Sequence, residues 1–204
     1  MADLDGDGHP DLAFRWDLVQ RRPDGKVLLL YRHERIFLEG LVKPGDKVVD
    51  VGGWGMLAQR LIEEGCDTTI LDLFTEDQQY ATRVCALPHV IGDVCDPDCF
   101  AAGSLNAVTC FETLEHVGSI RAAVESIYGW LKPSGVFVGT VPIPDVVHHT
   151  DESGIAFISA SKLAKLLRKV GFVNVRTAPT PSVNAGDDLP TSIYFRAWRS
   201  PGPR

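Results

Sequence analysis

The chain has 204 residues, a length typical of one domain with a small appendage and too short for two full domains. Its content of 45% hydrophobic and 23% charged residues is that of a globular protein, which excludes disorder over most of the chain. The formal net charge of −7 would repel a polyanion, so nucleic acid is not expected as a substrate.

Neither a membrane helix nor a secretion signal stands out in the sequence. The longest apolar stretches fall short of the ~20 residues that a membrane helix needs, and the acidic N-terminus does not look like a signal peptide. The five cysteines, an odd number without a C-x-x-C pair, are interpreted as reduced thiols rather than as disulfides or zinc ligands. These features predict a cytoplasmic protein that does not contact a membrane.

Residues 1–43 are predicted to form an N-terminal appendage. They begin with an acidic loop, D-x-D-x-D-G-x-x-D-L, which resembles the calcium loop of integrin-type propeller repeats. If this loop binds calcium, the ligands are Asp3, Asp5, Asp7 and Asp11; the alternative is a frayed acidic turn. A hairpin and then a helix over 32–41 are expected next, forming either a lid over the substrate or a structural cap on the sheet.

Residues 44–204 are predicted to form one α/β domain, because short β-branched runs alternate with amphipathic ones from Pro44-Gly45 onward. Strands are expected over 47–51, 68–73, 89–94, 107–111, 136–141, 173–177 and 193–198, and helices over 56–64, 76–84, 120–131 and 161–170. Ser159 and Ser161 can cap the last helix, and Gly171 ends it.

The spacing of these elements predicts the fold class. Strand–helix–strand units indicate parallel crossovers, whereas no helix separates the last two strands, which can therefore pair as an antiparallel hairpin. The expected fold is a Rossmann-like, doubly wound, mostly parallel seven-stranded sheet with an antiparallel C-terminal strand.

The most informative segment is the glycine-rich turn after the first strand of this domain. The strand Lys47–Val51 runs into Gly52, Gly53 and Gly55 and then into an amphipathic helix, a unit that lets the backbone approach a ligand closely. The second strand ends in Asp72, an acid that could accept hydrogen bonds from both hydroxyls of a ribose. Together these features predict an adenosine-type cofactor, and the absence of G-x-G-x-x-G disfavours a nicotinamide dehydrogenase.

Five segments, in order, are similar to the motifs of the class I S-adenosylmethionine-dependent methyltransferases that act on small molecules. They are the loop Asp50–Gly55, Leu71-Asp72, Gly92-Asp93-Val94, the run Ala107–Val117 with its Leu-Glu-His-Val ending, and the turn Leu131–Gly135. The resemblance spans about three quarters of the chain. It implies S-adenosylmethionine as the cofactor and, as the acceptor, an oxygen or nitrogen of a small molecule such as a sugar or a secondary metabolite.

The resemblance also implies which residues contact the cofactor. Asp72 would bind the ribose, Asp93 would bind the adenine amino group, and Glu112 would lie near the positively charged methionine portion. The full set is Asp50, Gly52, Gly53, Trp54, Gly55, Asp72, Leu73, Asp93, Val94, Phe111 and Glu112. In the usual D-x-G-x-G-x-G register the later glycines would fall at residues 54 and 56, so Trp54 packs either against the cofactor or under the loop.

Three histidines are the candidate catalytic groups. Methyl transfer from a sulfonium is an in-line displacement, and a hydroxyl acceptor gains from a general base, whereas an amine need only arrive unprotonated. His116 belongs to the fourth-strand motif, and His148 and His149 lie in the loop after the fifth strand. The alternatives are a packing role for His116 and a solvated loop for the other two.

Two further functions stay open on the sequence alone. The displaced glycines are compatible with a catalytically silent partner protein of the same fold. A nicotinamide-dependent oxidoreductase is the weaker alternative, because its fingerprint is missing.

Overall fold

The computed structural model of the chain describes residues 38–53, 55–73, 87–143, 158–180 and 192–202. The predicted acidic loop, the hairpin and the helix over 76–84 lie outside these ranges. Trp54, His148 and His149 also lie outside them.

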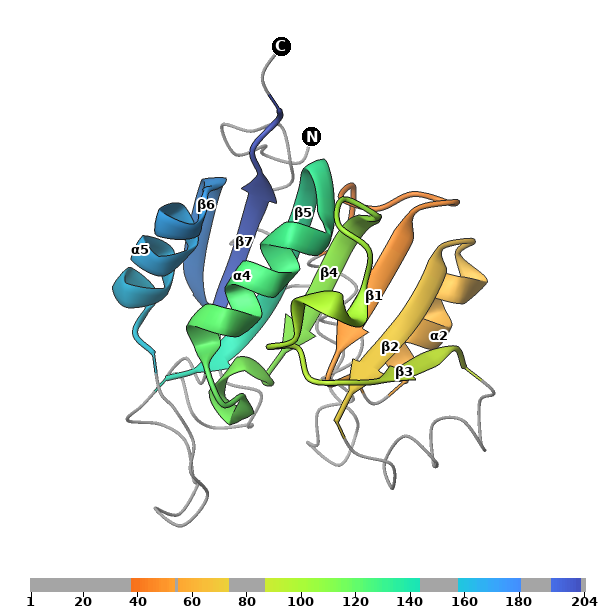
Figure 1. Cartoon of the computed structure of the whole chain (residues 1–204), viewed down its shortest axis with the longest axis horizontal. Helices are drawn as coiled ribbons and strands as arrows, with labels where there is room; N and C mark the ends of the chain where they lie inside the picture. The colour runs from red at the N-terminus through yellow and green to blue at the C-terminus, as the bar shows by residue number, and fades with distance from the viewer. Residues whose placement is uncertain (1–37, 54, 74–86, 144–157, 181–191, 203–204) are drawn as a thin grey trace, which may run out of the picture.

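Seven strands form one sheet in the order β3-β2-β1-β4-β5-β7-β6 (Figure 1). Every neighbouring pair from β3 to β5 is parallel, and β7 runs antiparallel to both β5 and β6. The predicted fold class is therefore confirmed, including the antiparallel pairing of the last two strands. The strands are β1 (Lys47–Val51), β2 (Asp67–Asp72), β3 (His89–Ile91), β4 (Leu105–Phe111), β5 (Leu131–Pro142), β6 (Phe172–Thr180) and β7 (Ser192–Arg199).

Helices cover both faces of this sheet (Figure 1). On one face lie α4 (Ile120–Trp130) and α5 (Ala160–Val170), which pack with β4, β5 and β7 into the larger apolar core. On the other face, α2 (Met56–Glu63) and the fully buried Leu38 pack against β1, β4, β5 and β7. Two short 3-10 helices, η3 (Pro97–Cys99) and η4 (Leu114–His116), flank β4 in the sequence.

The ends of the helices follow local rules, with one exception. Ser119 caps α4, because its hydroxyl accepts a hydrogen bond from the amide of Ala122 at 3.2 Å. Gly171, with φ +121°, ends α5 as predicted. The predicted serine cap of α5 is wrong: Ser159 occupies the N-cap position, but its hydroxyl makes no capping bond and lies 3.3 Å from the Ser161 hydroxyl.

Several predicted bounds differ from those in the structure. The third strand ends at Ile91, three residues early, because the chain turns over residues 93–96, where the amide of Asp96 donates a hydrogen bond to the carbonyl oxygen of Asp93. The fifth strand begins at Leu131, five residues early, because Leu131 pairs with Leu105 ahead of an irregularity in the β4–β5 register. Residues 38–41, predicted as the end of a helix, form a turn.

The described cysteines are free thiols, in line with the sequence interpretation: Cys66 and Cys110 are buried, and Cys95 and Cys99 are partly buried. None of the helices that the structure describes is long and apolar enough to cross a membrane. The division of the chain at residues 43 and 44 stays a prediction.

Candidate functional site

The carboxyl ends of β1, β2 and β4 meet at one edge of the sheet. The strand register places Val51 level with the residues just before Asp72 and Phe111. Gly52, Asp72 and Phe111 therefore follow side by side, one position further along. Ligands of open α/β sheets bind at this edge, so the structure brings together three of the predicted cofactor residues.

The turn between β1 and α2 has little room for any residue but glycine. Gly52 adopts φ +68°, and a Cβ there would collide with the Thr113 hydroxyl. A Cβ at Gly53 would collide with the Asp50 carboxylate. Gly55 is the N-cap residue of α2. At the two positions that differ from the usual register, glycine is therefore favoured by the nearby Asp50 carboxylate at residue 53 and by the left-handed backbone, φ +89°, at residue 55.

Asp50 lies beneath the turn rather than on the surface. Its side chain is 3% exposed, and the Thr109 hydroxyl donates a hydrogen bond to it at 2.6 Å. Burial raises the pKa of Asp50 to about 6, and the bond from Thr109 partly opposes that rise. A direct contact between Asp50 and the cofactor stays a prediction.

Apolar surface flanks the acid at the end of β2. Leu73 is 50% exposed and Ile91, at the end of β3, is 57% exposed, although both are large hydrophobic residues.

Asp93 is exposed, and one of its carboxylate oxygens accepts a hydrogen bond from the amide two residues further on, at 2.8 Å. Val94 is 5% exposed and packs into the core, so its predicted contact with a ligand finds no support in its burial. Sequence reasoning missed Ile91, because exposure could not be inferred from the strand pattern.

Two acids and a histidine follow β4. Glu112 is partly buried and adopts φ +49°, an uncommon conformation for this residue. Glu115 is 2% exposed, and burial together with the negative charge of Glu112 raises its pKa to about 8. The exposed His116 has its Nε2 atom 3.8 Å from a carboxylate oxygen of Glu115. Sequence reasoning missed Glu115 as a site residue, although it lies inside the Leu-Glu-His-Val motif.

The proposed calcium ligands and the two loop histidines lie outside the described residues. Within the ranges that the structure covers, no group of three or more metal-ligating side chains occurs. The calcium prediction therefore stays untested, as does a catalytic role for His148 or His149.

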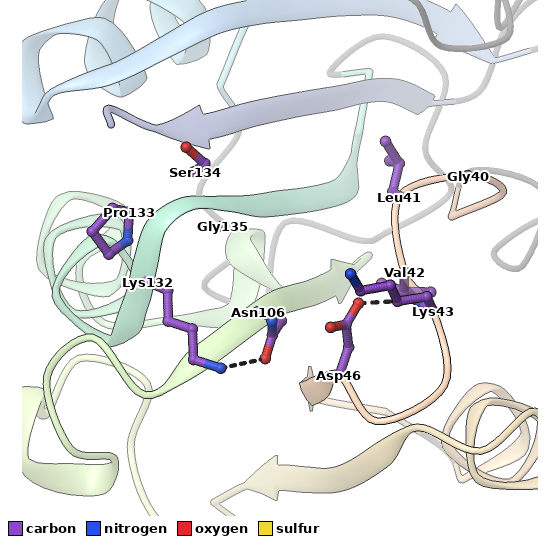
Figure 2. A pocket seen from close by; sticks show the side chains of 10 residues that line it. All are labelled: Gly40, Leu41, Val42, Lys43, Asp46, Asn106, Lys132, Pro133, Ser134 and Gly135. Atoms are coloured by element: carbon purple, nitrogen blue, oxygen red, sulfur yellow. Dashed lines mark hydrogen bonds between the residues drawn. The ribbon is translucent and has the colours of Figure 1, made fainter. Parts of the chain in front are cut away.

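A pocket of about 330 Å³ opens at the opposite edge of the sheet, between the loop over 40–46 and residues 132–135 at the start of β5 (Figure 2). Asn106 Oδ1 accepts hydrogen bonds from Lys132 Nζ at 2.7 Å and from the amide of Lys47 at 3.0 Å. Asp46 accepts one from the amide of Lys43 at 2.9 Å. These bonds tie together the amino ends of β1, β4 and β5, far from the carboxyl edge.

The residues at the carboxyl edge fit an adenosine-type cofactor. Asp72 is partly exposed where a ribose could reach it, and Leu73 and Ile91 offer apolar surface to a planar ring. The N-terminus of α2 starts directly behind the glycine turn, where main-chain amides favour polar ligand groups.

A family model described as a methyltransferase domain matches residues 24–177. The ubiquinone biosynthesis O-methyltransferase of Pectobacterium atrosepticum is 37% identical over 110 residues, which are 50% of this chain and 45% of that protein. The enzyme of the same name from Idiomarina loihiensis is 34% identical over 147 residues, 64% of this chain and 57% of that protein. The chain thus spans about half the length of the curated relatives it matches.

Solved structures share the fold. A SAM-dependent methyltransferase from Archaeoglobus fulgidus superposes with a TM-score of 0.67 at 18% identity, over 82% of this chain and 91% of that one. The seven-stranded sheet with its antiparallel β7 agrees with this likeness. Because the methyltransferase-domain model matches three quarters of its residues, the chain belongs to the family of class I S-adenosylmethionine-dependent methyltransferases.

Proposed function

We propose that this chain transfers a methyl group from S-adenosylmethionine to a hydroxyl oxygen of a small-molecule acceptor. The observation that carries the proposal is the alignment of Gly52, Asp72 and Phe111 at one edge of the sheet, beside exposed apolar surface. The names of the curated relatives support oxygen rather than nitrogen as the methylated atom. A sugar or a secondary metabolite stays the predicted kind of acceptor.

In this proposal, the carboxyl edge holds the cofactor through side chains of different chemistry. The Asp72 carboxylate accepts hydrogen bonds from the ribose hydroxyls, and Leu73 and Ile91 flank the adenine. Asp93 receives the adenine amino group, and Glu112 lies toward the cationic methionine portion. When bound, S-adenosylmethionine supplies an electrophilic methyl group on a sulfonium. The chain's own contribution is to orient the acceptor and exclude water.

A hydroxyl acceptor must lose its proton, and His116 is the described residue that we propose as the base. Its side chain is exposed beyond β4, and histidine is the side chain whose ordinary titration range reaches neutral pH. Glu115 is unsuited to the role, because a pKa of about 8 keeps its carboxyl mostly protonated at neutral pH. His148 and His149 stay the alternative bases.

Calorimetric titration with S-adenosylmethionine, S-adenosylhomocysteine and NAD tests the cofactor. We expect micromolar binding of the first two and none of NAD. Asp72→Ala should weaken binding by roughly tenfold or more, because it removes hydrogen bonds to a charged acceptor. Asp67→Ala is the matched control, since Asp67 lies exposed at the other end of β2, where its carboxylate is 3.9 Å from Lys47 Nζ. Equal affinity in the two variants would remove Asp72 from the site.

Transfer of a labelled methyl group to a panel of hydroxyl, amine and carboxylate compounds tests the reaction. Products from hydroxyl compounds alone, with turnover reduced in His116→Gln at unchanged cofactor affinity, are the expected result. Cofactor binding without transfer to any member of the panel would favour the silent partner protein. Binding of NAD in place of S-adenosylmethionine would favour the oxidoreductase.

A further inference from the structure

Thr109, in the middle of β4, makes an unusual buried contact with β1. Its side chain is fully buried, and its hydroxyl lies 2.6 Å from Asp50 Oδ1 and 3.4 Å from the carbonyl oxygen of Val49. Because a hydroxyl has a single proton, the short contact identifies the carboxylate as the main acceptor. The parallel register places Asp50 and Thr109 side by side on neighbouring strands.

The same carboxylate also lies against the glycine turn. Its second oxygen, Oδ2, lies so close to Gly53 that a Cβ there would collide with it. In its present orientation the Asp50 carboxylate fills the space beside Gly53 in which a side chain would lie. Thr109 fixes that orientation from the opposite side, through Oδ1.

We propose that Thr109 is a positioning residue for the cofactor: its hydroxyl holds the Asp50 carboxylate against Gly53 and so sets the backbone turn on which the cofactor lies. The inference deepens the proposed function and rests on it. Thr109 itself does not reach the carboxyl edge, since the strand continues for two residues beyond it.

The hydrogen bond also has an electrostatic consequence. Burial raises the pKa of Asp50 to about 6, and the bond from Thr109 acts in the opposite direction by stabilising the charged form. Among the described residues, the buried Cys110 thiol also interacts with Asp50: burial raises its pKa well above the ordinary value, and the negative charges of Glu115 and Asp50 add to that rise. Without the Thr109 hydroxyl, Asp50 should stay protonated to higher pH, and a protonated carboxyl is a weaker hydrogen-bond acceptor for its surroundings.

Affinity for S-adenosylhomocysteine, measured by calorimetry between pH 5.5 and 8.5, tests the inference. Thr109→Val keeps the shape and removes the donor, so we expect affinity near pH 7 to fall roughly tenfold, with the midpoint of its pH dependence moved to higher pH. Thr109→Ser keeps the donor and should restore both the affinity and the midpoint. Should Thr109→Val fail to fold, Thr109→Cys carries the same prediction with a weaker donor and a smaller shift.

Thr68→Val is the matched control. Thr68 is likewise buried, on the neighbouring strand β2, and its hydroxyl has no hydrogen-bond partner among the residues that the structure describes. Its affinity and pH midpoint should match those of the unmodified chain. A loss as large as that of Thr109→Val would mean that any buried Thr-to-Val change disturbs the site, and would overturn the inference.

The outcomes separate this inference from the proposed function. If the unmodified chain binds S-adenosylhomocysteine and Thr109→Val binds it equally well at every pH, the inference fails and the proposed function stands. If the unmodified chain binds neither S-adenosylmethionine nor S-adenosylhomocysteine, the proposed function fails and the positioning role falls with it.

Discussion

Glu115 couples the stability of the protein to pH. Its carboxyl is buried, and its Oε2 atom has no hydrogen-bond partner among the described residues. Burial raises its pKa from 4.5 to about 8, so the folded state holds its proton where the unfolded state releases it. The contribution of the protonated Glu115 to the free energy of unfolding is therefore complete below about pH 4.5. It is lost as pH rises toward 8, by at most ~1.4 kcal/mol per pH unit.

Glu115→Gln should therefore flatten the alkaline side of the stability profile. Relative to the unmodified chain, the variant should gain free energy of unfolding as pH rises from 5 to 9, because glutamine has no charge to bury. Urea denaturation at five pH values measures this difference. Glu125→Gln is the control, since Glu125 is exposed and paired with Arg121 within α4. A difference between Glu115→Gln and the unmodified chain that does not change with pH would contradict the assignment.

At the scale of single residues, the sequence predicts which residues lie at strand ends better than it predicts how deeply a residue is buried or what it contacts. Asp72 was predicted at a strand end, and the structure places it there, because a β-branched run followed by an acid is visible in one dimension. The burial of Glu115 and the contact between Thr109 and Asp50 depend on how β4 lies against β1. That register is set by packing between residues about 60 positions apart, which no local pattern records.

The contact between β4 and β5 requires a glycine on β5. A Cβ at Gly139 would collide with the carbonyl oxygen of Cys110 on the neighbouring strand, and both elements lie in the interior of the sheet. We expect Gly139→Ala to lower the free energy of unfolding by about 1–3 kcal/mol or more, because the backbone of β4 or β5 has to move to make room for the added methyl group. Chemical denaturation measures the loss.

Gly129 provides the comparison for this prediction. It lies in α4, and a Cβ there would meet nothing within 4 Å. Gly129→Ala should stabilise the protein by up to about 1 kcal/mol, because alanine favours the helix and restricts the unfolded chain. If both variants lost stability equally, the close approach of β4 and β5 at Gly139 would not be the cause.

Helices and strands were predicted well where periodicity is local and less well where pairing sets the bounds. The predicted strand over 47–51 matches β1, and the predicted helix over 120–131 exceeds α4 by one residue. The early start of β5 at Leu131 arises from a register irregularity opposite Leu105, a feature of two strands rather than one. The missing side-chain cap at Ser159 shows that a suitable residue type does not guarantee the hydrogen bond.

At the scale of the whole molecule, the alternation of strands and helices was enough to predict the seven-stranded sheet and its antiparallel end. The convergence of β1, β2 and β4 at one edge follows from that topology, so the position of the candidate site at this edge was predictable. An acceptor site was not, because in this fold class such sites are built from connecting loops, whose sequences follow no periodic rule.

Binding at that edge should stabilise the molecule as a unit. A ligand that binds the folded state alone adds about 2.7 kcal/mol at a concentration one hundred times its Kd. For a chain of 204 residues, each kcal/mol raises Tm by roughly 2–4 °C, so saturating S-adenosylhomocysteine should raise Tm by several degrees. Differential scanning fluorimetry measures the shift, which should grow with the logarithm of ligand concentration. Asp67→Ala should keep the shift, and Asp72→Ala, with roughly tenfold weaker binding, should lose about half of it or more at the same ligand concentration. Equal shifts in the two variants would place the ligand away from the carboxyl ends of β1 and β2.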